Sequence, residues 1–170
     1  MGHIQSHPGE SSGFAPRGGS WAEYAGYEGL RSVLDPADAA GHKNAGIDRL
    51  HRAALARALP RGPRVARGLD LGCGTGRLCP FLAARVGHLA AVDATPAMLR
   101  RARHESRVAN VGFARSDGVA LPFRDACLDL VVSVYVLQYA VADAALYGRM
   151  LSGTYKIPNI YCSVKDDSEK

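Results

Sequence analysis

The sequence lacks a long apolar run, and its N-terminus lacks the apolar core segment that a secretory signal contains. The longest mostly apolar stretch, Cys127–Leu137, is interrupted by Asp129, whereas a membrane-spanning helix needs about 20 apolar residues. We therefore expect a cytoplasmic protein without a transmembrane segment.

Closely spaced cysteine pairs are also missing. The four cysteines are Cys73, Cys79, Cys127 and Cys162, and they form no C-x-x-C pair. In a chain without an export signal, this spacing favours free thiols over a disulfide framework or a zinc site. The sequence predicts no metal site.

The composition that remains is that of one ordinary domain. The chain has 170 residues, of which 47% are hydrophobic and 22% charged, and its formal net charge is +5. Its densest basic group is Arg100, Arg101, Arg103 and Arg107. Because the other arginines are scattered, this group is typical of a solvated helix face rather than of a nucleic-acid patch.

Changes in composition divide the chain into four segments. Residues 1–20 are rich in glycine, proline and serine and are predicted to be a disordered leader. Residues 21–63 form a helical segment, 64–145 alternate between strands and helices, and 146–170 form an atypical tail. All 17 arginines lie in residues 1–150, while 151–170 contain lysine and no arginine. This shift indicates an alternative exon, a frameshift or a gene-model artefact in the tail.

Hydrophobic patterning predicts an α/β fold. Helical periodicity is expected over Gly46–Leu59 and Arg77–Val86, and Thr95 followed by Pro96 is a typical helix start with a hydroxyl cap. The predicted strands are Val65–Leu71, Leu89–Val92, Val111–Ala114 and Leu128–Val136. The last strand is almost continuously apolar, which is typical of a parallel sheet covered on both faces.

The strongest motif is a glycine-rich turn that follows the first predicted strand, LDLGCGTGR at residues 69–77. Glycine accepts positive φ and lets a ligand lie against the backbone. The dinucleotide fingerprint G-x-G-x-x-G would require glycine where Arg77 stands, and no P-loop triplet occurs. Both phosphate-binding interpretations therefore lose support.

Two carboxylates follow the next two strands. Asp93 closes the second strand, where a carboxylate can accept hydrogen bonds from both hydroxyls of a ribose. Asp117 and Gly118 follow the third strand, where a carboxylate and a backbone N–H favour adenine. The spacing therefore indicates a nucleoside ligand.

Three stretches together resemble the class I S-adenosylmethionine-dependent methyltransferases, especially the type 11 group: LDLGCGTGR (69–77), AVDATPAMLRRAR (91–103) and SDGVALPFRDACLDLVVSVYVLQY (116–139). The resemblance implies a Rossmann-like three-layer sandwich with a mostly parallel sheet, and S-adenosylmethionine as cofactor. The methyl acceptor is open; a small molecule is favoured, and RNA or protein are the other classes.

The resemblance also implies roles for individual residues. Asp70, Gly72, Cys73 and Gly74 would lie beneath the methionine part of the cofactor, with Asp70 near its amino group. Further cofactor-binding positions are Asp93 at the ribose, Ala94 and Met98 at the adenine, Asp117 and Gly118 reading adenine, and Ser133 through its carbonyl. Tyr135 and Gln138 would face the reactive methyl group and the substrate. No residue is identified as catalytic.

The chain departs from the family pattern after the fourth strand. The family's later strands and helices are absent, so the sheet is expected to be incomplete, with Ile160–Val164 as a weak substitute strand. An exposed fourth strand would favour a protein partner at that edge. Two alternatives stay open: a truncated isoform that binds cofactor or a partner without catalysis, and an NAD-dependent oxidoreductase, against which Arg77 argues.

Overall fold

The computed structural model describes residues 19–59, 61–118, 121–124, 127–136 and 160–163. The N-terminal segment contains helix α1 (Trp21–Tyr24), a 3₁₀ turn η1 (Gly29–Ser32) and helix α2 (His42–Ala58). Helix α2 begins four residues before the predicted start because the Asp38 carboxylate accepts the backbone N–H groups of Gly41 at 3.0 Å and Asn44 at 2.7 Å. These bonds satisfy donors that a helix start leaves open.

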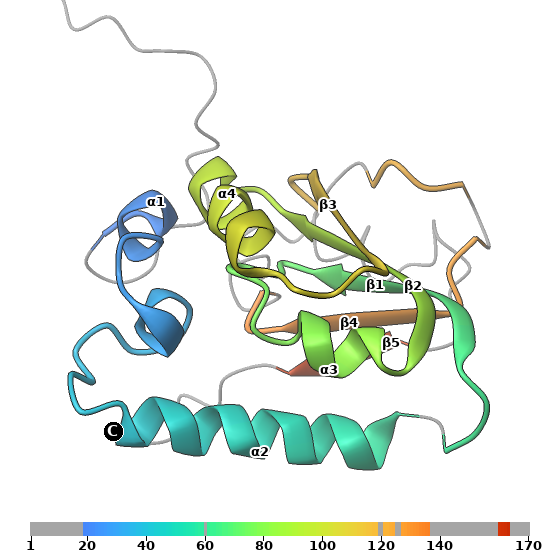
Figure 1. The fold of residues 1–170 in the computed structure, drawn as a ribbon, viewed down its shortest axis with the longest axis horizontal. Helices are drawn as coiled ribbons and strands as arrows, with labels where there is room; N and C mark the ends of the chain where they lie inside the picture. The colour runs from blue at the N-terminus through green and yellow to red at the C-terminus, as the bar shows by residue number, and fades with distance from the viewer. Residues whose placement is uncertain (1–18, 60, 119–120, 125–126, 137–159, 164–170) are drawn as a thin grey trace, which may run out of the picture.

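All strand pairs of the central sheet are parallel, and the strand order is β3-β2-β1-β4-β5 (Figure 1). The strands are β1 (Val65–Leu71), β2 (Val86–Asp93), β3 (Val111–Arg115), β4 (Leu130–Val134) and β5 (Ile160–Ser163). The predicted α/β class is confirmed, and β1 has the predicted bounds.

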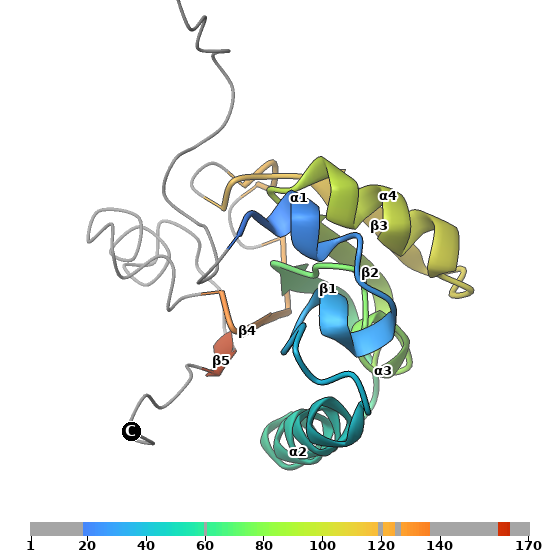
Figure 2. The same cartoon turned by 90° about the vertical axis from the view of Figure 1, so that its left-hand side faces the viewer.

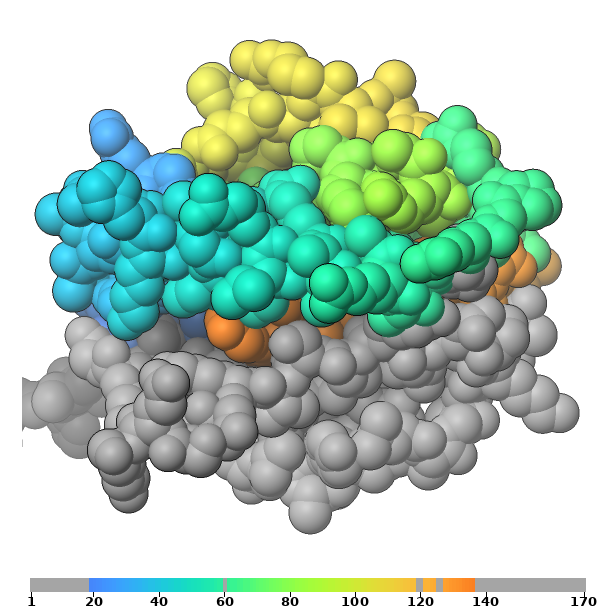
Figure 3. All heavy atoms as spheres, turned by 90° about the horizontal axis from the view of Figure 1, so that it is seen from below, coloured from blue at the N-terminus to red at the C-terminus, as the bar shows by residue number. Residues whose placement is uncertain are grey.

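Helices α3 (Cys79–Ala83) and α4 (Pro96–Glu105) connect β1 to β2 and β2 to β3. They lie on the same side of the sheet as α2 (Figure 2), as expected when successive right-handed crossovers run in one direction. Leu55 of α2, Leu82 of α3 and Leu99 of α4 pack there in one apolar cluster with β2 and β4. Figure 3 shows α2 running along this side of the molecule, beside α3.

Two local predictions around these helices are wrong. The helix predicted over Arg77–Val86 is shorter, because the backbone still turns at Gly76 with φ +80° and extends again from Val86. Thr95 precedes α4, but its hydroxyl makes no cap hydrogen bond. Its own backbone N–H instead donates to the Asp93 carboxylate at 2.8 Å.

The expectation of an exposed β4 edge is also wrong. Strand β5 pairs with β4 in parallel, with Val131 opposite Ile160 and Val134 opposite Ser163. Its backbone satisfies the hydrogen-bonding groups that would otherwise attract another chain. The substitute strand predicted at Ile160–Val164 is therefore confirmed, and the partner predicted for an exposed β4 loses its physical basis.

None of the helices among the described residues has the length and apolar character needed to cross a membrane. The cytoplasmic location and the four segment boundaries stay predictions. Most of the leader and of the tail lies outside the described residues.

Candidate cofactor-binding site

A cavity opens at the carboxyl ends of β1, β2, β3 and β4, the position at which open parallel sheets bind ligands. The predicted site residues in its wall are Asp70, Gly72, Cys73, Gly74, Asp93, Ala94, Met98, Asp117, Gly118 and Tyr135. The fold therefore brings together residues from four separate turns. Ser133 does not line the cavity, and Gln138 lies outside the described residues.

The glycine loop after β1 has a backbone that other residues adopt with difficulty. Gly72 and Gly74 have φ values of +75° and +56°. A Cβ atom on Gly72 would lie 2.0 Å from Cγ2 of Val136, and one on Gly74 would lie 2.7 Å from Cγ1 of Val33. Glycine is therefore required here both by conformation and by space.

Asp93 joins the glycine loop to the turn after β2. One carboxylate oxygen accepts the N–H of Gly74 at 2.9 Å, and the other accepts the N–H of Thr95 at 2.8 Å. Burial raises the pKa of Asp93, whereas these hydrogen bonds lower it. Because each oxygen has a second lone pair, the carboxylate can still accept hydrogen bonds from a ligand.

Asp70 is a buried carboxylate at the end of β1. Burial raises its pKa to about 7, and the positive charge of Arg77 partly offsets this rise. Its oxygen lies 3.8 Å from the thiol of Cys79, and within the described residues it forms no salt bridge. A cationic group on a ligand would favour the ionised form of this buried carboxylate, so Asp70 is suited to bind one.

The predicted adenine-reading turn differs in one detail from the expected arrangement. The N–H of Gly118 donates to the Ser116 hydroxyl at 3.1 Å, so it already has an acceptor. Ser116 also lines the cavity. Asp117 is exposed at the rim of the cavity, where its carboxylate can reach an approaching ligand.

The remaining predicted residues differ in their burial and in their contacts. Met98 is a fully buried residue of the wall, whereas Ala94 is an exposed one. Burial raises the pKa of the Cys73 thiol above its ordinary value, which excludes a reactive thiolate. The hydroxyl of Ser133 donates to the Leu71 carbonyl at 3.3 Å and so links β4 to β1.

Several wall residues were not predicted from the sequence, notably Trp21, Val33 and Arg77. Trp21 is the only tryptophan of the chain. Arg77 binds the Asp48 carboxylate of α2 at 2.8 Å. Asp48 and Arg52 are spaced i,i+4 and could have been recognised as a helix pair, but nothing local to α2 indicates its contact with Arg77.

Comparison with known proteins identifies the family. A family model described as a methyltransferase domain matches residues 69–153, which is half of the chain. The chain belongs to this methyltransferase family. Class I methyltransferases use S-adenosylmethionine. The prediction of a class I methyltransferase with this cofactor is therefore confirmed. The membership decides against the oxidoreductase alternative.

Two curated methyltransferases are similar in sequence. The chain is 41% identical over 75 residues to a ubiquinone/menaquinone biosynthesis C-methyltransferase UbiE of Acidiphilium cryptum, covering 41% of this chain and 30% of that protein. It is 34% identical over 113 residues to a demethylmenaquinone methyltransferase of Thermus thermophilus, covering 64% of this chain and 49% of that protein. The methyltransferase chain thus spans half or less of the length of these relatives.

A solved structure supports the same fold. It is a complex between the Trm112 methyltransferase activator of Haloferax volcanii and a putative methyltransferase, with a TM-score of 0.60 and 25% identity. The match covers 85% of this chain and 59% of that one. The Rossmann-like methyltransferase fold predicted from the sequence is therefore confirmed.

The residues present fit S-adenosylmethionine. At Gly72 and Gly74 the cavity wall is backbone without a side chain, and the Asp93 oxygens retain acceptor capacity. The buried Asp70 has the charge that an ammonium group requires, and the surrounding Leu71, Leu78 and Met98 are apolar. A cavity with these groups suits a ligand that combines an amino acid part with a nucleoside.

Proposed function

We propose that this chain binds S-adenosylmethionine in the described cavity and transfers its methyl group to a carbon atom of a quinone-type acceptor. The observation that carries the proposal is that one cavity contains the glycine loop, the buried Asp70 and the ribose-side candidate Asp93. When bound, the cofactor supplies an electrophilic methyl group on a sulfonium, so the protein mainly binds and aligns the reactants.

Each predicted binding residue receives a role consistent with its surroundings. Asp70 holds the cofactor's ammonium group, because it is a buried carboxylate in the cavity wall. Asp93 accepts hydrogen bonds from the ribose hydroxyls on the lone pairs that Gly74 and Thr95 leave unused. Asp117 faces the adenine from the cavity wall, to which the buried Met98 also contributes.

The Gly118 N–H contributes to adenine binding only if it exchanges or shares its bond with Ser116. The Ser133 carbonyl keeps the role that the family resemblance implies only if a ligand reaches past the lining residues. Cofactor binding therefore depends mainly on Asp70 and Asp93.

The acceptor class comes from the two curated relatives, whose names specify ubiquinone, menaquinone or demethylmenaquinone chemistry. The cavity is consistent with a planar ring, since Trp21 and Tyr135 both lie in its wall. Aromatic side chains offer a flat apolar surface together with a polar edge.

The test uses the full chain in two steps. Calorimetry first measures binding of S-adenosylhomocysteine, with NAD as the comparison ligand. The protein is then incubated with S-adenosylmethionine carrying a tritiated methyl group and a reduced short-chain demethylmenaquinone. Tritium in the extracted quinone, lost in the Asp93→Ala variant, supports the proposal.

The other outcomes distinguish the alternatives. Binding without transfer to any acceptor favours the non-catalytic cofactor-binding protein. Transfer to RNA or protein in place of the quinone contradicts the acceptor class but retains the methyltransferase activity. Absence of S-adenosylhomocysteine binding contradicts the whole proposal.

A further inference from the structure

Tyr135 has an unusual backbone. Among the described residues it is the single non-glycine residue with a left-handed conformation, at φ 63°. Such a conformation costs on the order of 1–3 kcal/mol and persists only where the surroundings hold it in place. Tyr135 follows β4 directly and lies in the cavity wall, so its strain occurs at the proposed reaction site.

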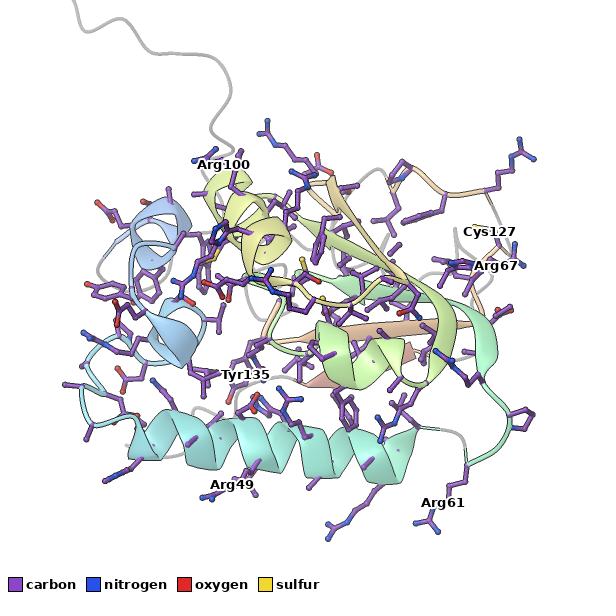
Figure 4. The ribbon with its side chains drawn as sticks, viewed as in Figure 1. Arg49, Arg61, Arg67, Arg100, Cys127 and Tyr135 are labelled. Atoms are coloured by element: carbon purple, nitrogen blue, oxygen red, sulfur yellow. The ribbon has the colours of Figure 1, made fainter. Side chains whose placement is uncertain are left out.

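The side chain that packs against Tyr135 comes from another part of the chain. The ring of His51, on α2, lies 4.7 Å from the Tyr135 ring between centroids, with an interplanar angle of 86°. This is an edge-to-face contact of the favourable kind. Figure 4 shows Tyr135 between the end of β4 and α2. His51 itself does not line the cavity.

The orientation of His51 is fixed by Arg77. A terminal guanidinium nitrogen of Arg77 lies 2.8 Å from Nδ1 of His51. Arginine can only donate, so Nδ1 accepts and the proton of the neutral ring lies on Nε2. Burial and the charge of Arg77 lower the pKa of His51 to about 4, although Asp48 partly opposes this shift. The imidazole is therefore neutral at neutral pH.

Arg77 is held in turn by α2. Its other terminal nitrogen donates to Asp48 at 2.8 Å, and its side chain is only 10% exposed. Arg52 donates to the second oxygen of Asp48 and to the backbone carbonyl of Arg77, each at 2.7 Å. Ion pairs with little exposure and several hydrogen bonds are geometrically well defined. The three residues form a rigid support behind His51.

We propose that His51 is a positioning residue that holds Tyr135 in its left-handed conformation at the cavity wall, with Asp48 and Arg77 fixing the imidazole ring. The proposal rests on the proposed function, because the use of Tyr135 is alignment of the acceptor beside the cofactor. In this tautomer His51 has no unoccupied lone pair with which to act as a base, because Nδ1 accepts from Arg77 and Nε2 carries the proton. Helix α2, which contains His51, thereby contributes to the geometry of the reaction site.

Two variants separate the ring contact from the hydrogen bond. His51→Phe retains an aromatic ring against Tyr135 but has no acceptor for Arg77. His51→Asn retains an acceptor near the position of Nδ1 but has no ring. Arg49→Gln is the matched control, since Arg49 lies on the same helix, is exposed and points away from the sheet (Figure 4).

The first measurement needs neither cofactor nor acceptor. The seven tyrosines are labelled with 3-fluorotyrosine, and the ¹⁹F resonance of Tyr135 is assigned as the one missing in Tyr135→Phe. We expect His51→Asn to move or broaden this resonance, whereas His51→Phe and Arg49→Gln leave it close to its original position. Circular dichroism checks that each variant is folded.

The second measurement is steady-state methyl transfer. A misplaced group at a reaction site can cost up to about 100-fold in rate. We expect kcat of His51→Asn to fall about tenfold or more, with the S-adenosylhomocysteine Kd changed less than about threefold, and His51→Phe to recover most of the loss. A residue with a merely structural role would lower stability and leave kcat of the folded fraction unchanged.

An unchanged Tyr135 resonance in His51→Asn overturns the proposal, and so do equal changes in the Phe and Asn variants. If the unmodified protein transfers no methyl group to the quinol, the proposed function fails, while the ¹⁹F comparison still decides whether His51 holds Tyr135.

Discussion

The carboxylate of Asp93 accepts the backbone N–H of Gly74 across 2.9 Å and thereby ties the turn after β2 to the glycine loop after β1. A residue proposed to bind the ribose thus also shapes the loop proposed to lie beneath the methionine part. Ligand affinity and loop geometry should therefore change together when this carboxylate is altered.

Substitution of Asp93 by Asn tests this dual role. An asparagine side chain has a single acceptor oxygen, so one of the N–H groups of Gly74 and Thr95 loses its partner. We expect unfolding to become easier by about 1–3 kcal/mol, the cost of a buried donor left without an acceptor. Denaturant unfolding measures this change, and calorimetry should show at least about tenfold weaker S-adenosylhomocysteine binding, or ~1.4 kcal/mol.

Substitution of Gly72 by Ala should destabilise the glycine loop. The added Cβ would approach Val136 to 2.0 Å at a φ of +75°, so we expect a loss of about 2 kcal/mol or more in the free energy of unfolding. Thermal unfolding checks this. The double variant Gly72→Ala, Val136→Ala should recover part of the loss.

Gly62 provides the control for this substitution. A Cβ atom there would meet nothing within 4 Å, so Gly62→Ala should change the unfolding free energy by less than about 0.5 kcal/mol. Equal losses at Gly62 and Gly72 would contradict the clash with Val136.

Cofactor binding should depend on pH through Asp70. Burial raises its pKa to about 7 in the protein without ligand, and a bound ammonium group favours the ionised carboxylate. S-adenosylhomocysteine affinity should therefore increase as pH rises from about 5.5 to 7.5. Calorimetry across this range measures the slope, and Asp70→Asn should remove most of it.

The raised pKa of Asp70 also makes the free energy of unfolding depend on pH, and this free energy should fall as pH rises. The folded-state pKa of Asp70 is above its ordinary value, so its favourable contribution is fully present below about pH 4 and is lost as pH rises through about 7. Comparing the unfolding free energy of the protein and its Asp70→Asn variant across this range isolates the effect. A difference between them that does not vary with pH would contradict the raised pKa.

Trp21 should report ligand binding. It is the only tryptophan, it lies in the cavity wall, and Arg101 of α4 holds its segment by donating to the backbone carbonyls of Ala25 and Tyr27. We expect S-adenosylhomocysteine to change the tryptophan emission, and Arg101→Ala to weaken binding severalfold by loosening this wall. Arg100→Ala is the matched control, because Arg100 is exposed on the same helix (Figure 4).

The central half of the sheet and the glycine loop were predictable because their signals are local. Val65–Leu71 is a short strand candidate that ends at a glycine cluster, and the structure gives the same bounds. The hydroxyl cap predicted at Thr95 is wrong because the Thr95 side chain hydrogen-bonds to Asp93, two residues earlier. Such competition between neighbouring side chains is invisible to a pattern of residue types.

The parts of the site that could not be predicted depend on long-range contacts. The sequence marks Arg77 only as the residue that breaks a dinucleotide fingerprint, yet Arg77 joins Asp48 and His51 of α2 to the cavity wall. Trp21 likewise reaches the cavity from the segment before the first strand. These contacts depend on how α1 and α2 pack against the sheet. Hydrophobic periodicity predicts which face of a helix is buried, but it does not predict which residues that face contacts.

The position of β1 between β2 and β4 has a consequence for the order in which the sheet assembles. Val65 of β1 pairs with Val86, only a short helix away, whereas Gly68 pairs with Leu130. Closing the longer loop costs more chain entropy. We therefore expect β1, β2 and β3 to join first, so that β1 is temporarily a sheet edge, and β4 to convert it into the central strand afterwards.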